Sequence, residues 1–473
     1  MDKQIYLKEI SLRDYKCFQG VNVFPFSKAT DKKGKAGIYQ WTVFLGNNGT
    51  GKTNILKVIA NMEPVLVDSN IDKQNADKSE EVEDLFVDMA VAIGNNQISK
   101  DLSKAPQYRP KVVERFPSGN YDVSCGFLFS NQQRELAKKE CQNLVRSNTA
   151  IPQSNGTVLH MSSPTRIGYG PHQNSVDPTP ELAGFKIYAY GVNRIASKSG
   201  LNSELGDSAD SLFKEDVKLL NFEDWLLQLE LAKSNPKKKS GAEKVLKRLG
   251  EIFRKTEIMP AIKGFKMDTD DSFNNRILFV CEDGEFKFED LGYGYQCMLA
   301  WVFDFCKRMF DRYPNSENPL AEAAVVVIDE IDLHLHPKWQ RGLLKALTKL
   351  FPNTQFIVST HSPMIIQSMD GINLFVLRHQ ADGSVKADQM ENKNWEGWQM
   401  EEILQETMDV EDGYTSEELK EKIDHFNKAC SEENLQKAEN LFKELEMAVN
   451  PNGSLIQMLK MQIRDLRNYI EQQ

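Results

Sequence analysis

The sequence predicts an α/β fold in which helices flank a mixed, mostly parallel sheet, with one insertion and a C-terminal helical module. Two observations predict this. A strand, a glycine turn and a helix follow one another from Trp41 to Ile59, and two further strands, 323–328 and 355–360, are almost wholly apolar until they end in polar residues. We therefore expect a core formed by 1–64 and 185–395, an insertion at 65–184, and a helical module at 396–473.

The glycine turn contains the residues that a bound triphosphate needs. Glycines let backbone N–H groups point inward, and the N-terminus of the following helix adds positive potential. Lys52 would supply a mobile cation and Thr53 a hydroxyl for Mg²⁺. The predicted nucleotide-binding residues are Gly46, Asn47, Asn48, Gly49, Thr50, Gly51, Lys52, Thr53 and Asn54.

Polar residues at the ends of the other two strands complete the predicted site. Asp329 and Glu330 follow a β-branched run, where open α/β sheets bind ligands. Asp329 would hold Mg²⁺ through water, and Glu330 would orient or deprotonate the attacking water. His361, at the tip of the third strand, could donate a hydrogen bond to a γ-phosphate. We predict Glu330 and His361 as catalytic, and Thr53 and Asp329 as metal-binding.

Three other features give weaker signals. Gly292 and Gly294 lie in a second glycine turn that opens an apolar helix, which is a potential phosphate contact. The strand-like run 185–194 ends in a glycine turn with a cation, and this edge could face the nucleotide. His334 and His336 alternate around Leu335, but no further ligand lies at useful spacing, so packing or turn roles are favoured over a metal site.

The spacing of apolar residues predicts the strands and helices of the remaining segments. Residues 5–18 predict one or two short strands that pair beside the glycine-loop strand. Within the insertion, 121–129 is a weak strand and 132–145 a helix. In the tail, Ser431 is expected to start a helix, and Leu455, Leu459, Ile463, Leu466 and Ile470 form a near-heptad seam for another helix, from this chain or from a partner.

Composition limits the classes of function. The chain has 58 Lys+Arg and 68 Asp+Glu, a net charge of −10, which argues against coating nucleic acid over its whole surface but permits a local basic groove. The 7 cysteines are scattered, which indicates neither a disulfide framework nor a zinc module. The sequence begins without a signal peptide, and no run is long and apolar enough for a membrane span. We expect a cytoplasmic protein without membrane contact.

The order of these motifs resembles an ABC-type P-loop ATPase head. The run Asp329-Glu330-Ile331-Asp332-Leu333-His334-Leu335-His336-Pro337, followed by Ser359-Thr360-His361-Ser362-Pro363, is similar to the RecF- and SMC-like ATPases called AAA-15/21. With its helical tail, the chain resembles the ATPase subunits of bacterial anti-phage systems, most of all the PtuA family of Septu systems. The insertion stands where coiled-coil arms would leave such a head.

The resemblance implies ATP and Mg²⁺ as cofactors. Lys52 and Thr53 match the Walker A positions, Asp329 and Glu330 the Walker B positions, Asp332 the D-loop region and His361 the switch histidine. It also implies a head-to-head dimer or higher oligomer, in which Gly292 and Gly294 would complete the nucleotide site of the other subunit. Where many members have Leu-Ser-x-Gly, this chain has Leu291-Gly292-Tyr293-Gly294, so hydrolysis is expected to be slow.

Two functions fit this sequence. In the first, the chain is an ATPase subunit that senses infection and regulates a partner nuclease of HNH type, reaching nucleic acid through the complex. The alternative is a RecF- or SMC-like repair ATPase that clamps DNA directly, which would need a basic groove. A third, in which the insertion is itself a nuclease, would rest on His160, His172 and an acidic cluster that are too loosely spaced.

Overall fold

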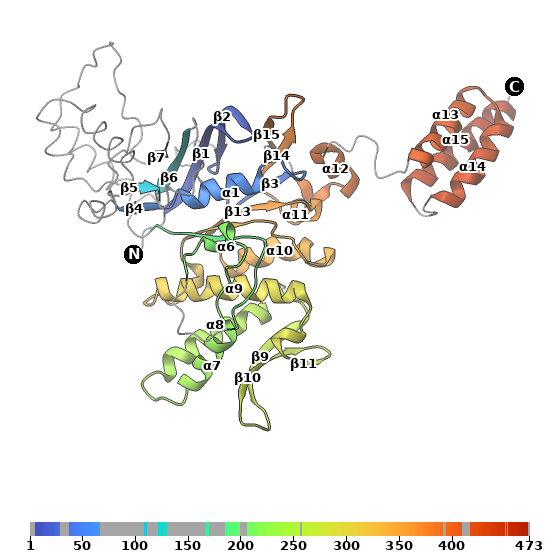
Figure 1. Cartoon of the computed structure of the whole chain (residues 1–473). Coiled ribbons are helices and arrows are strands. Elements are labelled where there is room, and N and C mark those ends of the chain that lie inside the picture. Colours follow the sequence, from blue (N-terminus) through green and yellow to red (C-terminus); the bar gives the residue numbers. More distant parts are fainter. Residues whose placement is uncertain are drawn as a thin grey trace, which may run out of the picture. The chain divides into compact units, whose positions relative to one another are not determined.

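The fold is described from a computed structural model of the whole chain (Figure 1). It describes residues 5–28, 37–66, 108–110, 122–129, 166–169, 185–198, 206–255, 258–390, 394–408, 417–449, 451 and 453–471. These residues form two compact units, Met1–Met400, here called the head, and Glu401–Gln473, here called the tail unit.

A six-stranded sheet forms the centre of the head. Its order is β15 (Val385–Met390), β14 (Asn373–His379), β3 (Trp41–Gly46), β13 (Thr354–Thr360), β12 (Ala324–Ile328) and β8 (Ile187–Tyr190). All neighbours are parallel except β15, which is antiparallel to β14. The predicted mixed, mostly parallel sheet is confirmed, and the three predicted strands β3, β13 and β12 are adjacent.

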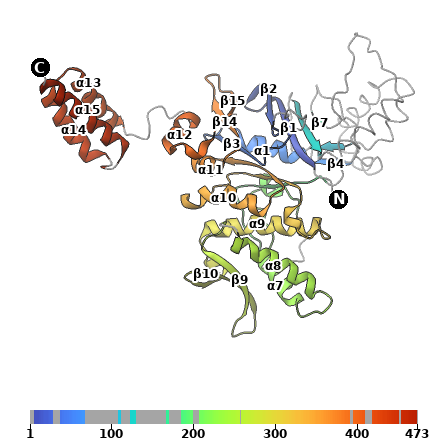
Figure 2. The same ribbon diagram turned by 180° about the vertical axis from the view of Figure 1, so that it is seen from behind.

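Helices cover both faces of this sheet. α1 (Lys52–Asn61) packs against one face, where Val325, Val327 and Ile357 share its hydrophobic core. α9 (Tyr293–Arg312) and α10 (Pro337–Leu350) lie on the other side in both ribbon views (Figures 1 and 2). Tyr190 of β8 meets Trp301 of α9 there, with ring centroids 5.7 Å apart. Because both faces are covered, the central strands are apolar throughout rather than alternating.

A second, antiparallel sheet lies over the α1 side. Its order is β2 (Phe18–Pro25), β1 (Ile5–Tyr15), β6 (Asp122–Phe129) and β7 (Arg166–Tyr169). The prediction that residues 5–18 pair beside the glycine-loop strand is therefore wrong. Leu7, Ile10 and Leu12 are fully buried and pack on the core around α1, so β1 covers the face of the central sheet instead of extending its edge.

The insertion contributes to that second sheet. The predicted strand at 121–129 is confirmed as β6, which pairs with β1. β4 (Pro64–Leu66) and β5 (Tyr108–Pro110) form a separate antiparallel pair. The predicted helix at 132–145, His160 and His172 lie outside the described residues.

The rest of the head extends beyond α9. Phe303 of α9 contacts Phe222 and Phe253, at ring-centroid distances of 5.1 and 6.0 Å. The remaining elements are α6 (Asp210–Phe213), α7 (Phe222–Ala232), α8 (Lys239–Lys255), β9 (Ile262–Thr269), β10 (Asn275–Cys281), β11 (Gly284–Phe286), α11 (Pro363–Gln367) and 3-10 turns at Phe288–Asp290, Pro319–Ala321 and Trp395–Gly397.

The tail unit contains α12 (Met400–Met408) and three helices that we call the tail bundle, α13 (Glu417–Ser431), α14 (Leu435–Ala448) and α15 (Ser454–Glu471). Ser431 ends α13, and Asn434 caps α14 by accepting the Lys437 N–H, so the predicted start at Ser431 is wrong. The bundle has its own core: the α15 seam packs against Phe426, Ala438 and Leu445. Of the two alternatives for the seam, the described structure shows packing within the chain.

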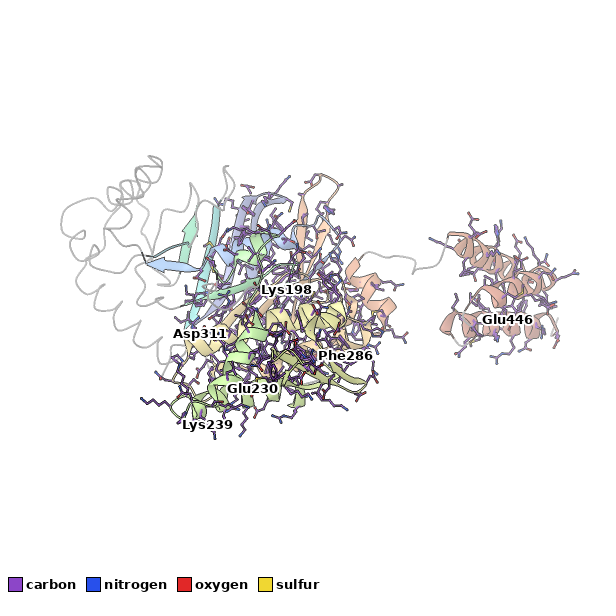
Figure 3. All side chains as sticks on the ribbon, turned by 60° about the horizontal axis from the view of Figure 1, so that its bottom comes forward. Lys198, Glu230, Lys239, Phe286, Asp311 and Glu446 are labelled. Carbon is purple, nitrogen blue, oxygen red and sulfur yellow. The ribbon has the colours of Figure 1, made fainter. Side chains whose placement is uncertain are left out.

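Charge is distributed unequally between the two units. Residues 401–473 contain 17 Asp+Glu and 8 Lys+Arg, a net charge of −9 of the chain's −10. Several of the bundle's acids pair across helices. Glu446, labelled in Figure 3, pairs with Lys460 at 3.2 Å, and Glu439 pairs with Arg467 at 2.6 Å. Such exposed pairs contribute little stability each, so the apolar core holds the bundle together.

Candidate nucleotide site

The glycine turn joins β3 to α1 as a tight backbone loop. Gly49 and Gly51 have φ values of +80° and +84°, which only glycine adopts readily. Thr50 donates its hydroxyl to the Asn47 carbonyl at 2.8 Å, which closes the loop. Gly51 precedes α1, so the unpaired N–H groups of the first helical turn lie at the loop. Successive inward N–H groups of this kind form an anion-binding concavity.

Two glycines of the loop also lack room for a side chain. A Cβ atom at Gly46 would lie 2.6 Å from the Leu377 carbonyl oxygen, and one at Gly51 would lie 2.6 Å from the Cys17 sulfur. The loop is therefore packed closely between β14 and the β1–β2 turn. This packing fixes the positions of its amides before any ligand binds.

Lys52 is buried beneath the loop, with 6% of its surface exposed. Its ammonium donates to the carbonyl oxygens of Gly46 at 2.8 Å and Asn47 at 2.9 Å. Burial lowers the pKa of Lys52, whereas the nearby Asp329 and Glu330 carboxylates act to raise it. The loop carbonyls and these acids thus hold a cation at the loop.

Thr53 and Asp329 join the loop to the end of β12, although 276 residues separate them. The Thr53 hydroxyl donates to Asp329 Oδ2 at 2.7 Å, and the Ser359 hydroxyl of β13 donates to Asp329 Oδ1 at 2.5 Å. Asp329 is 4% exposed. The Asp329 carboxylate therefore links the end of β12 to α1 and β13. Mg²⁺ prefers oxygen ligands, and the Thr53 hydroxyl and the Asp329 carboxylate lie side by side.

Glu330 has an unusual backbone conformation, with φ at +47°. Its N–H donates to the Ser359 hydroxyl at 2.8 Å, and its carbonyl accepts from Arg194 Nη2 at 2.7 Å. Arg194 also donates to the Asp329 carbonyl. Arg194 is 2% exposed and supports the backbone of the two acids from within the protein. The strand edge that the sequence predicted could face the nucleotide therefore lies beside these acids.

His361 follows β13 and is half-buried near the same charges. Burial and the nearby Lys52 cation lower the pKa of His361, with Glu330, Asp332 and Asp329 acting in the opposite direction. The imidazole is therefore neutral at pH near 7 and can offer one N–H. The adjacent Thr360 hydroxyl donates to Asp332 at 2.5 Å, which ties the turn after β12 to the same strand end.

The remaining predicted residues divide into two groups. Asn47 contributes its carbonyl to the loop, Asn48 is exposed, and the Asn54 side chain accepts from Lys16 at 2.7 Å. Gly292 and Gly294 are not packed at the loop: a Cβ at Gly294 would lie 2.4 Å from the His334 carbonyl oxygen, so this turn packs on the segment after β12.

His334 and His336 have packing and turn roles. The His334 ring contacts the Tyr293 ring edge to face, with centroids 4.6 Å apart. His336 caps α10, because its Nδ1 accepts the Lys338 N–H at 3.2 Å. Among the described residues no group of three or more His, Cys, Asp or Glu side chains is arranged to hold a metal ion by itself.

The fold and the loop define a class of protein. A glycine loop between the parallel strand β3 and a helix, with an acid at the end of β12, two strands away in the same parallel sheet, is a P-loop nucleotide-binding fold. Residues 123–366 match the AAA ATPase domain family, and the chain belongs to that family. The match includes Asp329, Glu330 and His361, and the glycine loop precedes it.

Two curated relatives extend the comparison. The chain is 28% identical over 399 residues to a Retron Vc95 probable ATPase from Vibrio cholerae, covering 77% of this chain and 72% of the relative. It is 29% identical over 199 residues to the Septu protein PtuA of Bacillus thuringiensis, covering 41% of this chain and 50% of the relative. The match thus spans about half the length of that Septu protein.

The chain was also compared with solved structures, and its helices were examined for membrane-spanning segments. An SMC head bound to the C-terminal winged-helix domain of ScpA aligns over 81% of this chain and 98% of that chain, with 17% identity and a TM-score of 0.40. Within the described residues, every helix is too short or too polar to cross a membrane.

Proposed function

We propose that this chain binds ATP with Mg²⁺ at the glycine loop and hydrolyses it. The observation that supports this most directly is the 2.7 Å hydrogen bond from Thr53 to Asp329, since it joins the loop to the acidic strand end beside the buried Lys52. The hydrogen bond thus brings together the two sequence motifs that a single bound nucleotide would need.

The residues present fit a magnesium-bound triphosphate. The left-handed glycines and the N-terminus of α1 offer N–H donors, Lys52 offers a cation, and Thr53 with Asp329 offers oxygen ligands. When bound, the nucleotide would supply the phosphoanhydride, and the magnesium ion a positive charge beside the acids. Glu330 would orient or deprotonate the attacking water, and neutral His361 would donate to the terminal phosphate.

We further propose that hydrolysis is slow and that two heads associate. The turn at Gly292 and Gly294 lacks the serine hydroxyl that related heads place there, so one transition-state donor is missing. Tyr293 in this turn is 49% exposed, and its turn does not pack at the chain's own loop. A second copy would bring its own turn to the nucleotide, and ATP would act largely as the ligand that holds two heads together.

At the level of biology, we propose an ATPase subunit of an anti-phage defence complex that regulates a partner nuclease, with an HNH nuclease as the first candidate. Support comes from the similarity to a Septu protein PtuA and to a retron ATPase, and from the separate tail unit. The trigger would act by changing how long ATP holds the heads together. Nucleic acid would then be reached through the partner.

Binding of a fluorescent ATP analogue tests the first step. Lys52→Ala should weaken binding at least about 100-fold because it removes the buried cation, whereas Lys263→Ala, in an exposed pair with Glu282, should not change it. Equal binding by wild type and Lys52→Ala would refute the site.

Size-exclusion chromatography and copurification test the remaining steps. Glu330→Gln should retain ATP and accumulate a dimer, and a monomer at saturating ATP and Mg²⁺ would contradict this. Copurification with a coexpressed nuclease of HNH type would support a regulatory role. Duplex binding by the isolated chain that ATP strengthens and salt weakens would instead favour direct clamping of DNA.

A further inference from the structure

Glu330 is held in a backbone conformation that glutamate rarely adopts. Its φ of +47° lies in the left-handed region, which costs on the order of 1 kcal/mol or more for a residue with a Cβ atom. Such a conformation persists only where neighbouring groups fix it. Its carboxylate lies within electrostatic range of both Lys52 and His361, so this backbone conformation determines where the acid stands in the site.

Two side chains fix Glu330, one at each of the two peptide groups that flank its Cα. The Ser359 hydroxyl accepts its N–H at 2.8 Å, and Arg194 donates to its carbonyl at 2.7 Å. Arg194 is itself anchored, because its Nε donates to the Gly191 carbonyl at 2.9 Å. Among the described residues, the hydrogen bonds of this buried arginine all go to backbone carbonyls, so the guanidinium stabilises the main chain.

Arg194 also lies beside the first turn of α9. Cys297 of that helix is an electrostatic neighbour of the guanidinium. In the same turn, the Tyr293 ring contacts the His334 ring and Gly294 packs against the His334 carbonyl. His334 also has a positive φ, +63°. The glycine turn before α9 thus contacts His334, and the turn that contains His334 is joined to Glu330 by a 3.0 Å hydrogen bond from the Leu333 N–H to the Glu330 carbonyl.

We propose that Arg194 is a positioning residue that holds Glu330 in its left-handed conformation, and that movement of the first turn of α9 reaches Glu330 through His334 and the hydrogen-bonded turn that joins His334 to Glu330. This rests on the proposed ATPase function for its catalytic part, though the bracing itself does not need nucleotide. A second head that contacts the exposed Tyr293 would thereby adjust the acid in the first head. The arrangement links association of two heads to the position of the hydrolytic acid.

The test compares Arg194→Gln, Arg194→Lys and a buried control. Arg308→Gln is matched, because Arg308 is a mostly buried arginine of α9 that pairs with Asp304 at 2.7 Å and does not contact Glu330. Thermal unfolding gives the folded fraction of each variant. The readouts are kcat and KM for ATP, and amide hydrogen exchange at Glu330 and Ile331 without nucleotide.

We expect kcat to fall about 100-fold in Arg194→Gln with KM changed less than about threefold, because a misplaced catalytic group affects the chemical step. Arg194→Lys should recover part of this. Exchange at Glu330 should rise about tenfold in Arg194→Gln and remain unchanged in Arg308→Gln. In a Glu330→Gln background, Arg194→Gln should cause no further loss, since the group it positions is gone.

Three results would overturn the proposal: unchanged exchange at Glu330, a fall in kcat no larger than in Arg308→Gln, or full additivity with Glu330→Gln. If wild-type protein does not hydrolyse ATP, the proposed function fails by itself. The exchange measurement then still decides whether Arg194 braces Glu330.

Discussion

Asp304 connects α9 to the edge of the central sheet, and we predict that Asp304→Ala is among the most damaging single substitutions in the head. The carboxylate is fully buried. Its Oδ2 accepts from Tyr190 at 2.9 Å and from Arg308 Nε at 2.7 Å, and its Oδ1 accepts the Leu220 N–H at 3.2 Å. Alanine would leave three donors without this acceptor.

The expected loss in the free energy of unfolding follows from the Arg308 charge, which stays buried without its partner. Removing one partner of a buried ion pair costs about 3 to 5 kcal/mol because the other charge is left uncompensated. We take the middle of this range, about 4 kcal/mol, because Arg308 also donates to the Gly206 carbonyl and its side chain is 14% exposed. Tyr190→Phe removes a single hydrogen bond to a charged group and should cost about 1.5 to 3 kcal/mol.

Tryptophan fluorescence during guanidinium chloride unfolding measures the free energy of unfolding of each variant. All 6 tryptophans lie between Trp41 and Trp398, so the signal reports the head alone. Asp311→Ala is the control, since Asp311 forms a half-exposed pair with Lys307 on the same helix (Figure 3). Arg308→Met in the Asp304→Ala background should restore at least about 2 kcal/mol. A cost below about 1 kcal/mol for Asp304→Ala, or one equal to the control, would refute the reasoning.

Three further predictions concern the loop, pH and the tail. Gly51→Ala should weaken ATP-analogue binding at least about tenfold, because alanine is strained at this φ and its Cβ meets Cys17. The control is Gly342→Ala, where a Cβ would meet no other atom. Unchanged affinity in Gly51→Ala would contradict the loop geometry. Burial and the nearby Glu289 raise the pKa of Glu223 from 4.5 to about 7. Between these two values the folded head binds more protons than the unfolded chain, so stability is lost as pH rises through this range. Glu223→Gln should therefore raise the melting temperature more at about pH 8 than at about pH 5.5, and an equal effect at both would be inconsistent with this. Residues 417–471 alone should be helical and unfold cooperatively on heating, because Phe426, Leu445 and Leu459 are fully buried within the bundle. Circular dichroism measures this unfolding. A gradual, non-cooperative loss of helix would show that the bundle depends on the rest of the chain.

The sheet and the placement of the loop could be predicted because they depend on local patterns. A glycine loop between β3 and α1, and acids after an apolar strand, are each visible within about ten residues. The meeting of the polar strand ends follows because parallel strands place their carboxyl ends at one edge of the sheet. The sequence thus indicated that Thr53 and Asp329 should be neighbours, and the structure places them 2.7 Å apart.

Other features depend on contacts that no local pattern carries. The mixed spacing of apolar residues in 5–18 predicted one or two short strands, but periodicity does not say which sheet a strand joins. The bracing role of Arg194 depends on a β8 turn meeting a β12 turn 135 residues away. The only signal was a cation directly after a glycine turn at a strand end. Tail seams were ambiguous for a similar reason: an apolar stripe has the same spacing whether its partner is in this chain or another.

The closed core of the tail bundle has a consequence for how such proteins diversify. A domain that buries its own apolar seam can be exchanged by recombination without repacking the domain to which it is joined. With a net charge of −9 in residues 401–473, a replacement would change the electrostatic character of the whole protein while leaving the nucleotide machinery intact. The tail bundle and the nucleotide site can then evolve as separate parts of one gene.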